Sequence, residues 1–333
     1  MKAFIVDRYK SKDVGRIGEM PEPEVRASDV LVEVHAAGLN VLDLKIAGGE
    51  FKLILPYKTP FVLGHDVAGV VTKVGSRVQR FKVGDEVYAR PVDHRIGTFA
   101  EFIAIDEKDV SLKPRDLTME EAASIPLVGL TAWQALIERA NLKKGQKVFI
   151  QAGSGGVGTF AIQLAKYLGA TVATTTSATN IDLVKKLGAD IVIDYKKDDF
   201  EKILHDYDLV LNSQDTTTLE KSLRVLKPGG KLISISGPPD PDFAKKIGLP
   251  WYMKWIIRLL SFGVRRKAKR LNVSYSFLFM SANGDQLREI TSLIDSGIIR
   301  PVVDRVFPFE STKDALVYVE KGRAKGKVVV KIR

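Results

Sequence analysis

Three glycines, Gly153, Gly155 and Gly158, are spaced in a way that could hold the pyrophosphate of a dinucleotide. The stretch 147–152 before them predicts a buried strand, and apolar residues at helical spacing over 159–168 predict a helix after them. In such a turn one glycine bends the chain, one lets the backbone approach phosphate, and one lets helix and strand pack closely. The helix N-terminus adds N–H groups and a positive dipole end. The alternative is a glycine-rich turn that binds no ligand.

The next predicted strand indicates which dinucleotide would bind. It ends Thr174-Thr175-Thr176-Ser177, and no carboxylate follows before Asp182. An NAD site usually has an acid about 20 residues after the glycines, where it holds the ribose 2′-hydroxyl. A hydroxyl-rich end leaves room for a 2′-phosphate, so the sequence favours NADPH. Ser177 could also simply cap the next helix, and both roles are compatible because they use the same N–H groups.

Composition narrows the remaining chemistry. The 333 residues include no cysteine, which excludes disulfides and any zinc or iron–sulfur site ligated by cysteine. Neither a Ser-His-Asp set nor a convincing carboxylate pair is found. The chain starts with a strand-like segment, has no apolar signal core and has no run of 18 apolar residues, so we expect a cytoplasmic protein.

The net charge of +11 is concentrated in one segment. Nine basic residues and no acidic residue lie between Lys245 and Arg270, and outside them 42 basic residues balance 40 acidic ones. This pattern does not favour a nucleic-acid surface. The stretch 251–262 is apolar nearly all around a helix, so it could cover a substrate cleft, contact a second copy or lie on a membrane surface. We favour the first two uses; contact of 245–270 with anionic lipid would be weak.

The order of elements predicts two domains. Residues 1–120 are rich in short strands separated by Gly and Pro, which is typical of a compact, partly open β-barrel. From residue 147 strands and helices alternate, which predicts a doubly wound parallel sheet. Residues 120–139 are expected to be mainly helical, and the last strand, 328–332, is expected to rejoin the N-terminal domain.

Eight segments spread over nearly the whole chain resemble the medium-chain dehydrogenase/reductase superfamily, and within it the zinc-independent quinone oxidoreductases and enone or alkenal reductases. They are AAGLNVLDLKIAGG (36–49), PFVLGHDVAGVVTKVG (60–75), FKVGDEVYA (81–89), EEAASIPLVGLTAWQAL (120–136), AGSGGVGTFAIQLAK (152–166), LGADIVIDY (187–195), LKPGGKLISISG (226–237) and KGRAKGKVVV (321–330). The resemblance implies a GroES-like catalytic domain (1–124 and 297–333) and a Rossmann NADPH-binding domain (125–296) with a basic-aromatic insert (238–272). It also implies a homodimer.

The resemblance further implies which residues act. Asn40 stands where zinc alcohol dehydrogenases have a cysteine, and the four-cysteine lobe is absent, so no metal is expected. His65 would be a hydrogen-bonding residue under the active-site floor. The implied catalytic residues are Asn40, Thr131 and Tyr57. The implied cofactor-binding residues are Gly153, Ser154, Gly155, Gly156, Val157, Gly158, Thr176, Ser177, Tyr195, Gly237, Arg323 and Lys327.

Alternatives remain for several of these residues. Thr131 could be a helix cap, and Tyr57 is displaced from the family's usual tyrosine position, so it could equally pack a loop. Lys45 could donate a proton but is more typical of a solvated lysine. Water could supply the proton.

The expected activity is hydride transfer from NADPH to a quinone or an α,β-unsaturated carbonyl. The alternative is an NADPH-binding peripheral membrane or interaction protein with little turnover.

Overall fold

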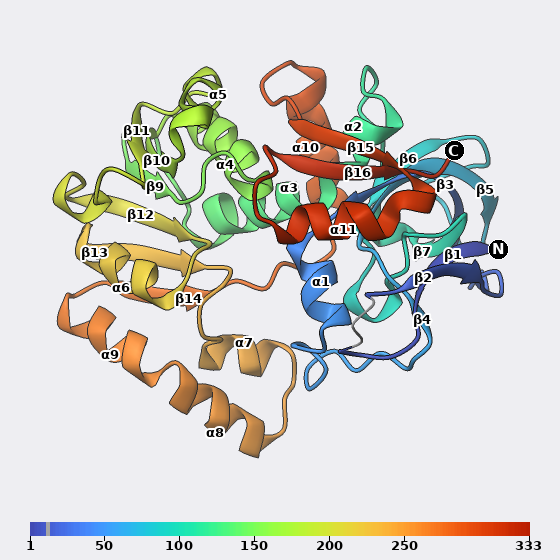
Figure 1. Ribbon diagram of the computed structural model, residues 1–333, viewed down its shortest axis with the longest axis horizontal. Helices are drawn as coiled ribbons and strands as arrows, with labels where there is room; N and C mark the ends of the chain where they lie inside the picture. The colour runs from blue at the N-terminus through green and yellow to red at the C-terminus, as the bar shows by residue number, and fades with distance from the viewer. Residues whose placement is uncertain (11–13) are drawn as a thin grey trace. The chain divides into compact units, whose positions relative to one another are not determined.

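The computed structural model describes residues 1–10 and 14–333, which form two compact units (Figure 1). Unit 1 comprises Met1–Leu130 and Ser281–Arg333, and unit 2 comprises Thr131–Met280. The sequence placed the boundaries at 124/125 and 296/297, so the structure differs at both. The second difference arises because α10 (Gly284–Asp295) packs on β8 (Val110–Leu112) in unit 1. There the Tyr88 hydroxyl donates to the Leu287 carbonyl at 2.7 Å.

Unit 2 is built on a six-stranded parallel sheet, as the sequence predicted. Its strands are β9 (Lys147–Ile150), β10 (Thr171–Thr176), β11 (Ile191–Asp194), β12 (Tyr207–Asn212), β13 (Leu226–Ser234) and β14 (Ser274–Phe277). Its helices are α4 (Gly156–Tyr167), α5 (Ile181–Lys186), α6 (Thr216–Arg224), α7 (Pro241–Lys246), α8 (Trp251–Leu260) and α9 (Phe262–Arg270). Val148, Phe149 and Ile150 are fully buried, because helices cover both faces of a doubly wound sheet.

The strand order of this sheet is β11-β10-β9-β12-β13-β14, with every neighbouring pair parallel. The order therefore reverses between β9 and β12. Helices α4 and α5 pack on β9–β11, whereas α6 and α9 pack on β12–β14. In such sheets ligands bind at the carboxyl ends of the strands beside this reversal, so the topology directs attention to the residues that follow β9 and β12.

The described residues of unit 1 form two sheets, which confirms the predicted strand-rich N-terminal domain. One sheet has the order β2-β1-β4; the other has the order β15-β16-β3-β5-β6-β8, with β7 also paired to β3. Its further strands are β1 (Lys2–Val6), β2 (Arg16–Glu19), β3 (Asp29–Leu39), β4 (Phe61–Val62), β5 (Asp66–Val74), β6 (Glu86–Ala89), β7 (Phe102–Asp106), β15 (Val303–Pro308) and β16 (Lys327–Lys331). Its further helices are α1 (Val41–Ala47), α2 (Met119–Ala123) and α11 (Thr312–Glu320), while α3 (Pro126–Trp133) crosses into unit 2.

Strand β3 is the centre of unit 1 and positions the residues at its end. Its valines Val30, Val32 and Val34 are fully buried, and the residues between them are only half-buried, which is the alternation of a strand with one face on the core. β16 pairs antiparallel with β3, and Val329 lies opposite Gly38. The predicted return of the final strand to the N-terminal domain is confirmed. Asn40 follows directly where β3 ends.

Within the described residues, no helix combines the length and the apolar character needed to cross a membrane.

Candidate functional site

The glycine turn of unit 2 links β9 to α4 through residues 151–155. A Cβ on Gly153 would lie 2.2 Å from the Thr174 Oγ1 atom, and one on Gly158 would lie 2.3 Å from the carbonyl oxygen of Ala152. These two glycines are therefore required by packing of the turn on β10 and of α4 on the turn. A Cβ on Gly155 would come no closer than 3.3 Å to another atom, so its open side is where a ligand could approach.

The N-terminus of α4 is open to a ligand in the same way. Gly155 is its N-cap residue, and no side chain of the described residues caps the helix. The first N–H groups of a helix lack intrahelical acceptors and carry its positive dipole end. The turn and helix can therefore bind an anion of the size and charge of a pyrophosphate.

Hydroxyl groups gather at the carboxyl end of β10, next to this turn. The Thr176 hydroxyl donates to Ser154 Oγ at 2.9 Å, and the Asn180 amide donates to both Ser154 Oγ and Ser177 Oγ at 3.3 Å. Tyr195, which is 60% exposed, follows β11 and donates its N–H to the Thr176 carbonyl at 3.2 Å. Ser177 occupies a helix N-cap position, but its hydroxyl bonds to Thr179 Oγ1 rather than capping the helix. The site residues predicted from 153–195 are thus brought together.

An acid at this edge was missed in the sequence. Asp194, at the end of β11, pairs in register with Thr176 and is buried. Its Oδ1 accepts the N–H of Lys196 at 3.1 Å, so one carboxylate oxygen is hydrogen-bonded within the turn that follows β11. The register of two parallel strands decides this placement, and sequence spacing does not reveal it.

A buried amide network at the reversal point was also missed. Gln151 Oε1 accepts from the Asn212 amide at 2.7 Å, and Asn212 Oδ1 accepts from the Ser234 hydroxyl at 2.6 Å. Ser234 Oγ in turn accepts the N–H of Gly237 at 2.8 Å. The network fixes the carboxyl ends of β9, β12 and β13 and places the predicted cofactor residue Gly237 beside them. The sequence signal that could have indicated this network is a polar residue at or directly after the end of each buried strand.

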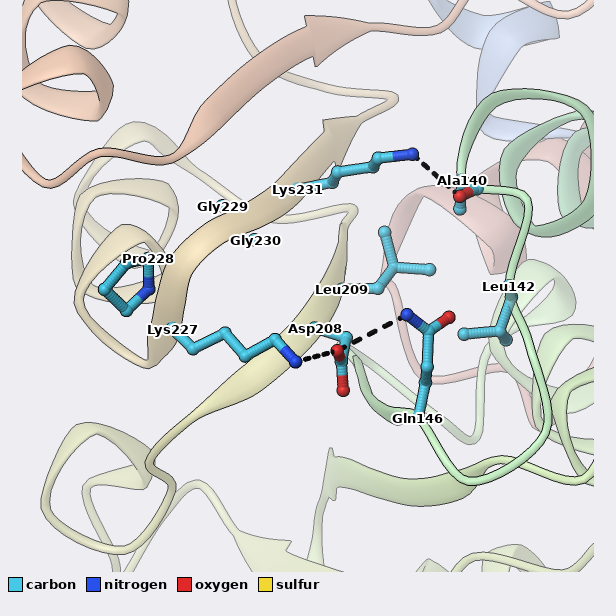
Figure 2. A pocket seen from close by; sticks show the side chains of 10 residues that line it. All are labelled: Ala140, Leu142, Gln146, Asp208, Leu209, Lys227, Pro228, Gly229, Gly230 and Lys231. Carbon is cyan, nitrogen blue, oxygen red and sulfur yellow. Dashed lines mark hydrogen bonds and ion pairs between the residues drawn. The ribbon is translucent and has the colours of Figure 1, made fainter.

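A cavity of about 180 Å³ lies at the opposite, amino-terminal edge of this sheet (Figure 2). Its charged groups are used internally: Lys227 pairs with Asp208 at 2.5 Å, and Lys231 donates to the Ala140 carbonyl at 2.9 Å. Because ligands of doubly wound sheets bind at the carboxyl ends, we do not assign the cofactor to this cavity.

The catalytic candidate of unit 1 is Asn40, which lies in a buried polar cluster with Lys327 and Asp66. The Lys327 ammonium donates to Asn40 Oδ1 at 2.5 Å, to Asp66 Oδ2 at 3.0 Å and to the Leu39 carbonyl at 2.8 Å. The Asn40 amide donates to Asp66 Oδ2 at 2.9 Å and makes a longer contact of 3.4 Å with the Gly38 carbonyl. Since lysine only donates and carboxylate only accepts, the orientation of the Asn40 amide is fixed.

Lys327 therefore has a different environment from the one predicted for it. The sequence placed it among the cofactor-binding residues, but its three N–H groups are taken by acceptors inside unit 1. Arg323, the other basic residue predicted there, is exposed in the turn between α11 and β16. Lys45 is half-buried on α1, and its ammonium lies 3.6 Å from a Glu50 carboxylate oxygen.

A second buried pair supports the start of α1. Asp43 Oδ2 accepts the Asn40 backbone N–H at 2.7 Å, and Asp43 Oδ1 lies 2.6 Å from His65 Nδ1. His65 is fully buried, and its Nε2 has no partner among the described residues. As the sequence predicted, His65 is a hydrogen-bonding residue.

The donor set around Asn40 does not fit zinc. Asn40 Oδ1 and Asp66 Oδ2 both contact an ammonium, so a second cation at these oxygens would meet the charge of Lys327. Among the described residues no group of three or more His, Asp or Glu side chains could hold a metal ion.

Thr131 does not lie at a helix start. It is buried in the second half of α3, which begins at Pro126, so the alternative that it caps a helix is wrong. Pro126 was the available signal, because proline is favoured at the first position of a helix.

Tyr57 packs within a loop of unit 1. Its hydroxyl donates to the Asp93 carbonyl, its ring stacks on Phe61 with centroids 5.2 Å apart, and its N–H donates to the Tyr9 hydroxyl at 2.8 Å. Burial raises the pKa of the Tyr57 phenol above its ordinary value, so it stays protonated at neutral pH. These contacts favour the loop-packing alternative over a catalytic role.

Replacing Tyr57 with phenylalanine is therefore expected to lower the free energy of unfolding by about 0.5–1.5 kcal/mol while leaving kcat within about twofold. Urea unfolding and steady-state turnover on one preparation measure both. A kcat loss of a hundredfold at unchanged stability would instead identify the phenol as a proton donor.

Comparisons with known proteins match the entire chain. Residues 26–115 match the family model described as alcohol dehydrogenase GroES-like domain, and residues 187–330 match that described as zinc-binding dehydrogenase. The mitochondrial NAD(P)H oxidoreductase RTN4IP1 of Danio rerio is 36% identical, over 100% of this chain and 91% of its own. The chloroplastic NADPH-dependent alkenal/one oxidoreductase of Arabidopsis thaliana is also 36% identical, over 99% and 79%. The solved quinone oxidoreductase of Coxiella burnetii superposes with a TM-score of 0.87 at 31% identity, covering 100% and 99% of the two chains.

Proposed function

Since the chain belongs to the medium-chain dehydrogenase/reductase superfamily of oxidoreductases, we propose that it is an NADPH-dependent, zinc-independent reductase of quinones or α,β-unsaturated carbonyls. The observation that carries the proposal is the hydroxyl cluster of Ser154, Thr176 and Ser177, in which Ser154 belongs to the glycine turn and directly precedes Gly155. The names of the relatives, which include NAD(P)H, alkenal/one and quinone oxidoreductases, support the acceptor class.

In unit 2 the chain would bind and orient the cofactor, which supplies a hydride when bound. The N–H groups of Gly156, Val157 and Gly158 would hold the pyrophosphate. Ser154, Thr176, Ser177 and Tyr195 would surround the 2′-phosphate, because hydroxyl groups donate to phosphate without adding negative charge.

In unit 1 the Asn40 amide would hold the oxygen of the acceptor. One of its hydrogens is donated to Asp66 at 2.9 Å, while the other makes, among the residues that the structure describes, only the 3.4 Å contact with Gly38. This second hydrogen can turn to an oxygen on which negative charge develops. Lys327 would keep the amide in the required orientation by fixing Oδ1. We propose that water supplies the proton, since the Tyr57 hydroxyl is engaged by Asp93.

Two further proposals concern the whole protein. We propose a homodimer through β14, because this strand is an edge of the unit 2 sheet. The cytoplasmic location stays a prediction.

The cofactor proposal is tested by adding the carboxylate that NAD sites carry. With quinones and short enones as acceptors, the wild type should show a kcat/KM at least about tenfold higher with NADPH than with NADH. Replacing Ser177 with aspartate should reverse that ratio, because the new charge repels a 2′-phosphate and accepts from a 2′-hydroxyl. Ser274→Asp, at the exposed amino-terminal end of β14, is the matched control and should leave the preference for NADPH.

Two outcomes would decide against this function. Equal kcat/KM with NADPH and NADH, in both the wild type and Ser177→Asp, would contradict a 2′-phosphate site at these hydroxyl groups. Saturable NADPH binding without turnover of any acceptor would favour the alternative of a binding protein.

A further inference from the structure

Helix α8 of unit 2 exposes large apolar side chains that the reductase chemistry does not use. Trp251 is 75% exposed, Leu259 67%, Leu260 62% and Trp255 58%. Helix α8 contacts α7 and α9. In Figure 1 the three helices are the orange segment that follows β13 along the chain and precedes β14. Exposed apolar side chains grouped in this way indicate a binding surface.

The side chains of α8 form four rows at i, i+4 spacing. The row of Met253 and Ile257 faces the protein, since Met253 is half-buried and Ile257 is buried. At 3.6 residues per turn, the row of Trp251, Trp255 and Leu259 lies on the opposite side and points away from the protein. The other two rows flank this outward row. One is apolar (Tyr252, Ile256 and Leu260), and the other is basic (Lys254 and Arg258).

Positive charge accompanies this apolar face. The Arg258 guanidinium lies 5.7 Å from the centre of the Trp255 ring, beside the outward row. Helix α9 continues directly with the exposed basic residues Arg266, Lys269 and Arg270. No acidic residue occurs anywhere in 243–284. A partner that fits must therefore offer both an apolar layer and negative charge.

The sequence alone favoured a cleft cover or a contact with a second copy for this segment, but the outward row is exposed and is accompanied by positive charge. We therefore propose that the exposed residues of α8, together with the basic residues of α9, dock this protein on an anionic lipid membrane. A lipid interface offers negative headgroups above an apolar layer, and tryptophan and tyrosine favour the boundary between them. The ten residues of α8 are too few to cross a bilayer, so the helix lies in the plane of the interface. A second copy fits less well, because an isologous contact would bring two basic surfaces together.

The test is sedimentation with vesicles at about 0.05 and 0.15 M salt. We expect at least about tenfold more binding to vesicles with roughly one third phosphatidylglycerol than to phosphatidylcholine alone, and less binding at the higher salt. Trp251→Ser/Trp255→Ser/Leu259→Ser should abolish binding. Lys254→Gln/Arg258→Gln should weaken it by about fivefold for each cation removed, a factor that corresponds to about 1 kcal/mol.

Because the substituted side chains are exposed, these variants should fold and retain NADPH binding, which circular dichroism and cofactor titration verify. Val83→Ser/Leu112→Ser is the matched control, since it removes exposed apolar side chains from unit 1 and should bind vesicles like the wild type.

Several results would overturn the proposal. They are no binding to either vesicle type, binding unaffected by the triple substitution, or a dimer that the triple substitution converts to a monomer. A changed KM for a water-soluble acceptor with unchanged vesicle binding would show that α8 covers the substrate instead. Loss of reductase activity would leave the vesicle result standing, because the two measurements are independent.

Discussion

Replacing Gly158 with alanine is expected to weaken NADPH binding by at least about a hundredfold and to destabilise unit 2 by about 1–3 kcal/mol. The new methyl group would lie 2.3 Å from the Ala152 carbonyl oxygen and 2.7 Å from Gly153 Cα. Both are backbone atoms, so α4 must move away from the turn, and the N–H groups at its start move with it. Cofactor titration by fluorescence and urea unfolding by circular dichroism measure the two effects.

Two other glycines separate binding from packing. In Gly155→Ala the new methyl group has its nearest contact at 3.3 Å, so the free energy of unfolding should stay within about 1 kcal/mol of the wild-type value. The same variant should nevertheless bind NADPH at least about tenfold more weakly, because the methyl group occupies the side from which the ligand approaches. Gly263→Ala, in the first turn of α9, meets no atom within 4 Å, so it should leave NADPH binding unchanged and should not lower stability, since alanine is favoured over glycine in a helix. Unchanged NADPH affinity in both Gly158→Ala and Gly155→Ala would show that this turn does not bind the cofactor.

Replacing Lys327 with methionine is expected to lower the free energy of unfolding by about 3–5 kcal/mol, because Asp66 would keep a buried negative charge without its cation. The Asn40 amide would also lose the group that fixes Oδ1. Loss of one oriented donor to a developing oxyanion lowers kcat by about a hundredfold or more. We therefore expect kcat to fall while KM for NADPH changes little.

The double variant Lys327→Met/Asp66→Asn provides the control. It removes both charges and allows the Asn40 amide to rotate and accept from the new amide, so it should regain more than half of the lost stability but little of the lost kcat. An equally unstable double variant would contradict the ion-pair explanation. A large rise in KM for NADPH in Lys327→Met, with kcat unchanged, would instead restore Lys327 to the cofactor site.

What could be predicted from the sequence was local. The glycine turn was found because strand, turn and helix follow one another within 25 residues, with glycines at the spacing of a dinucleotide loop. The parallel sheet was found because strands and helices alternate along the chain from residue 147. Asn40 was noticed because it replaces a residue type expected from the resemblance.

What could not be predicted depends on contacts between distant residues. A buried lysine cannot be told from an exposed one by its neighbours in the sequence, so the partners of Lys327 stayed hidden. The position of Asp194 beside Thr176 follows from strand register. The engagement of Tyr57 by Asp93 follows from the folding of a loop.

Because β16 pairs with β3, unit 1 can be completed only late in synthesis of the chain. Asp66 and its cation are separated by 261 residues, so at about 5–20 residues per second the ribosome needs roughly 15 to 50 s to deliver Lys327 after Asp66 has emerged. Unit 2 is a continuous segment and can fold during that interval. Until the last strand arrives, the nascent unit 1 holds a carboxylate without its counter-charge and a β3 edge without a partner. A chaperone that shields this edge would act before translation ends.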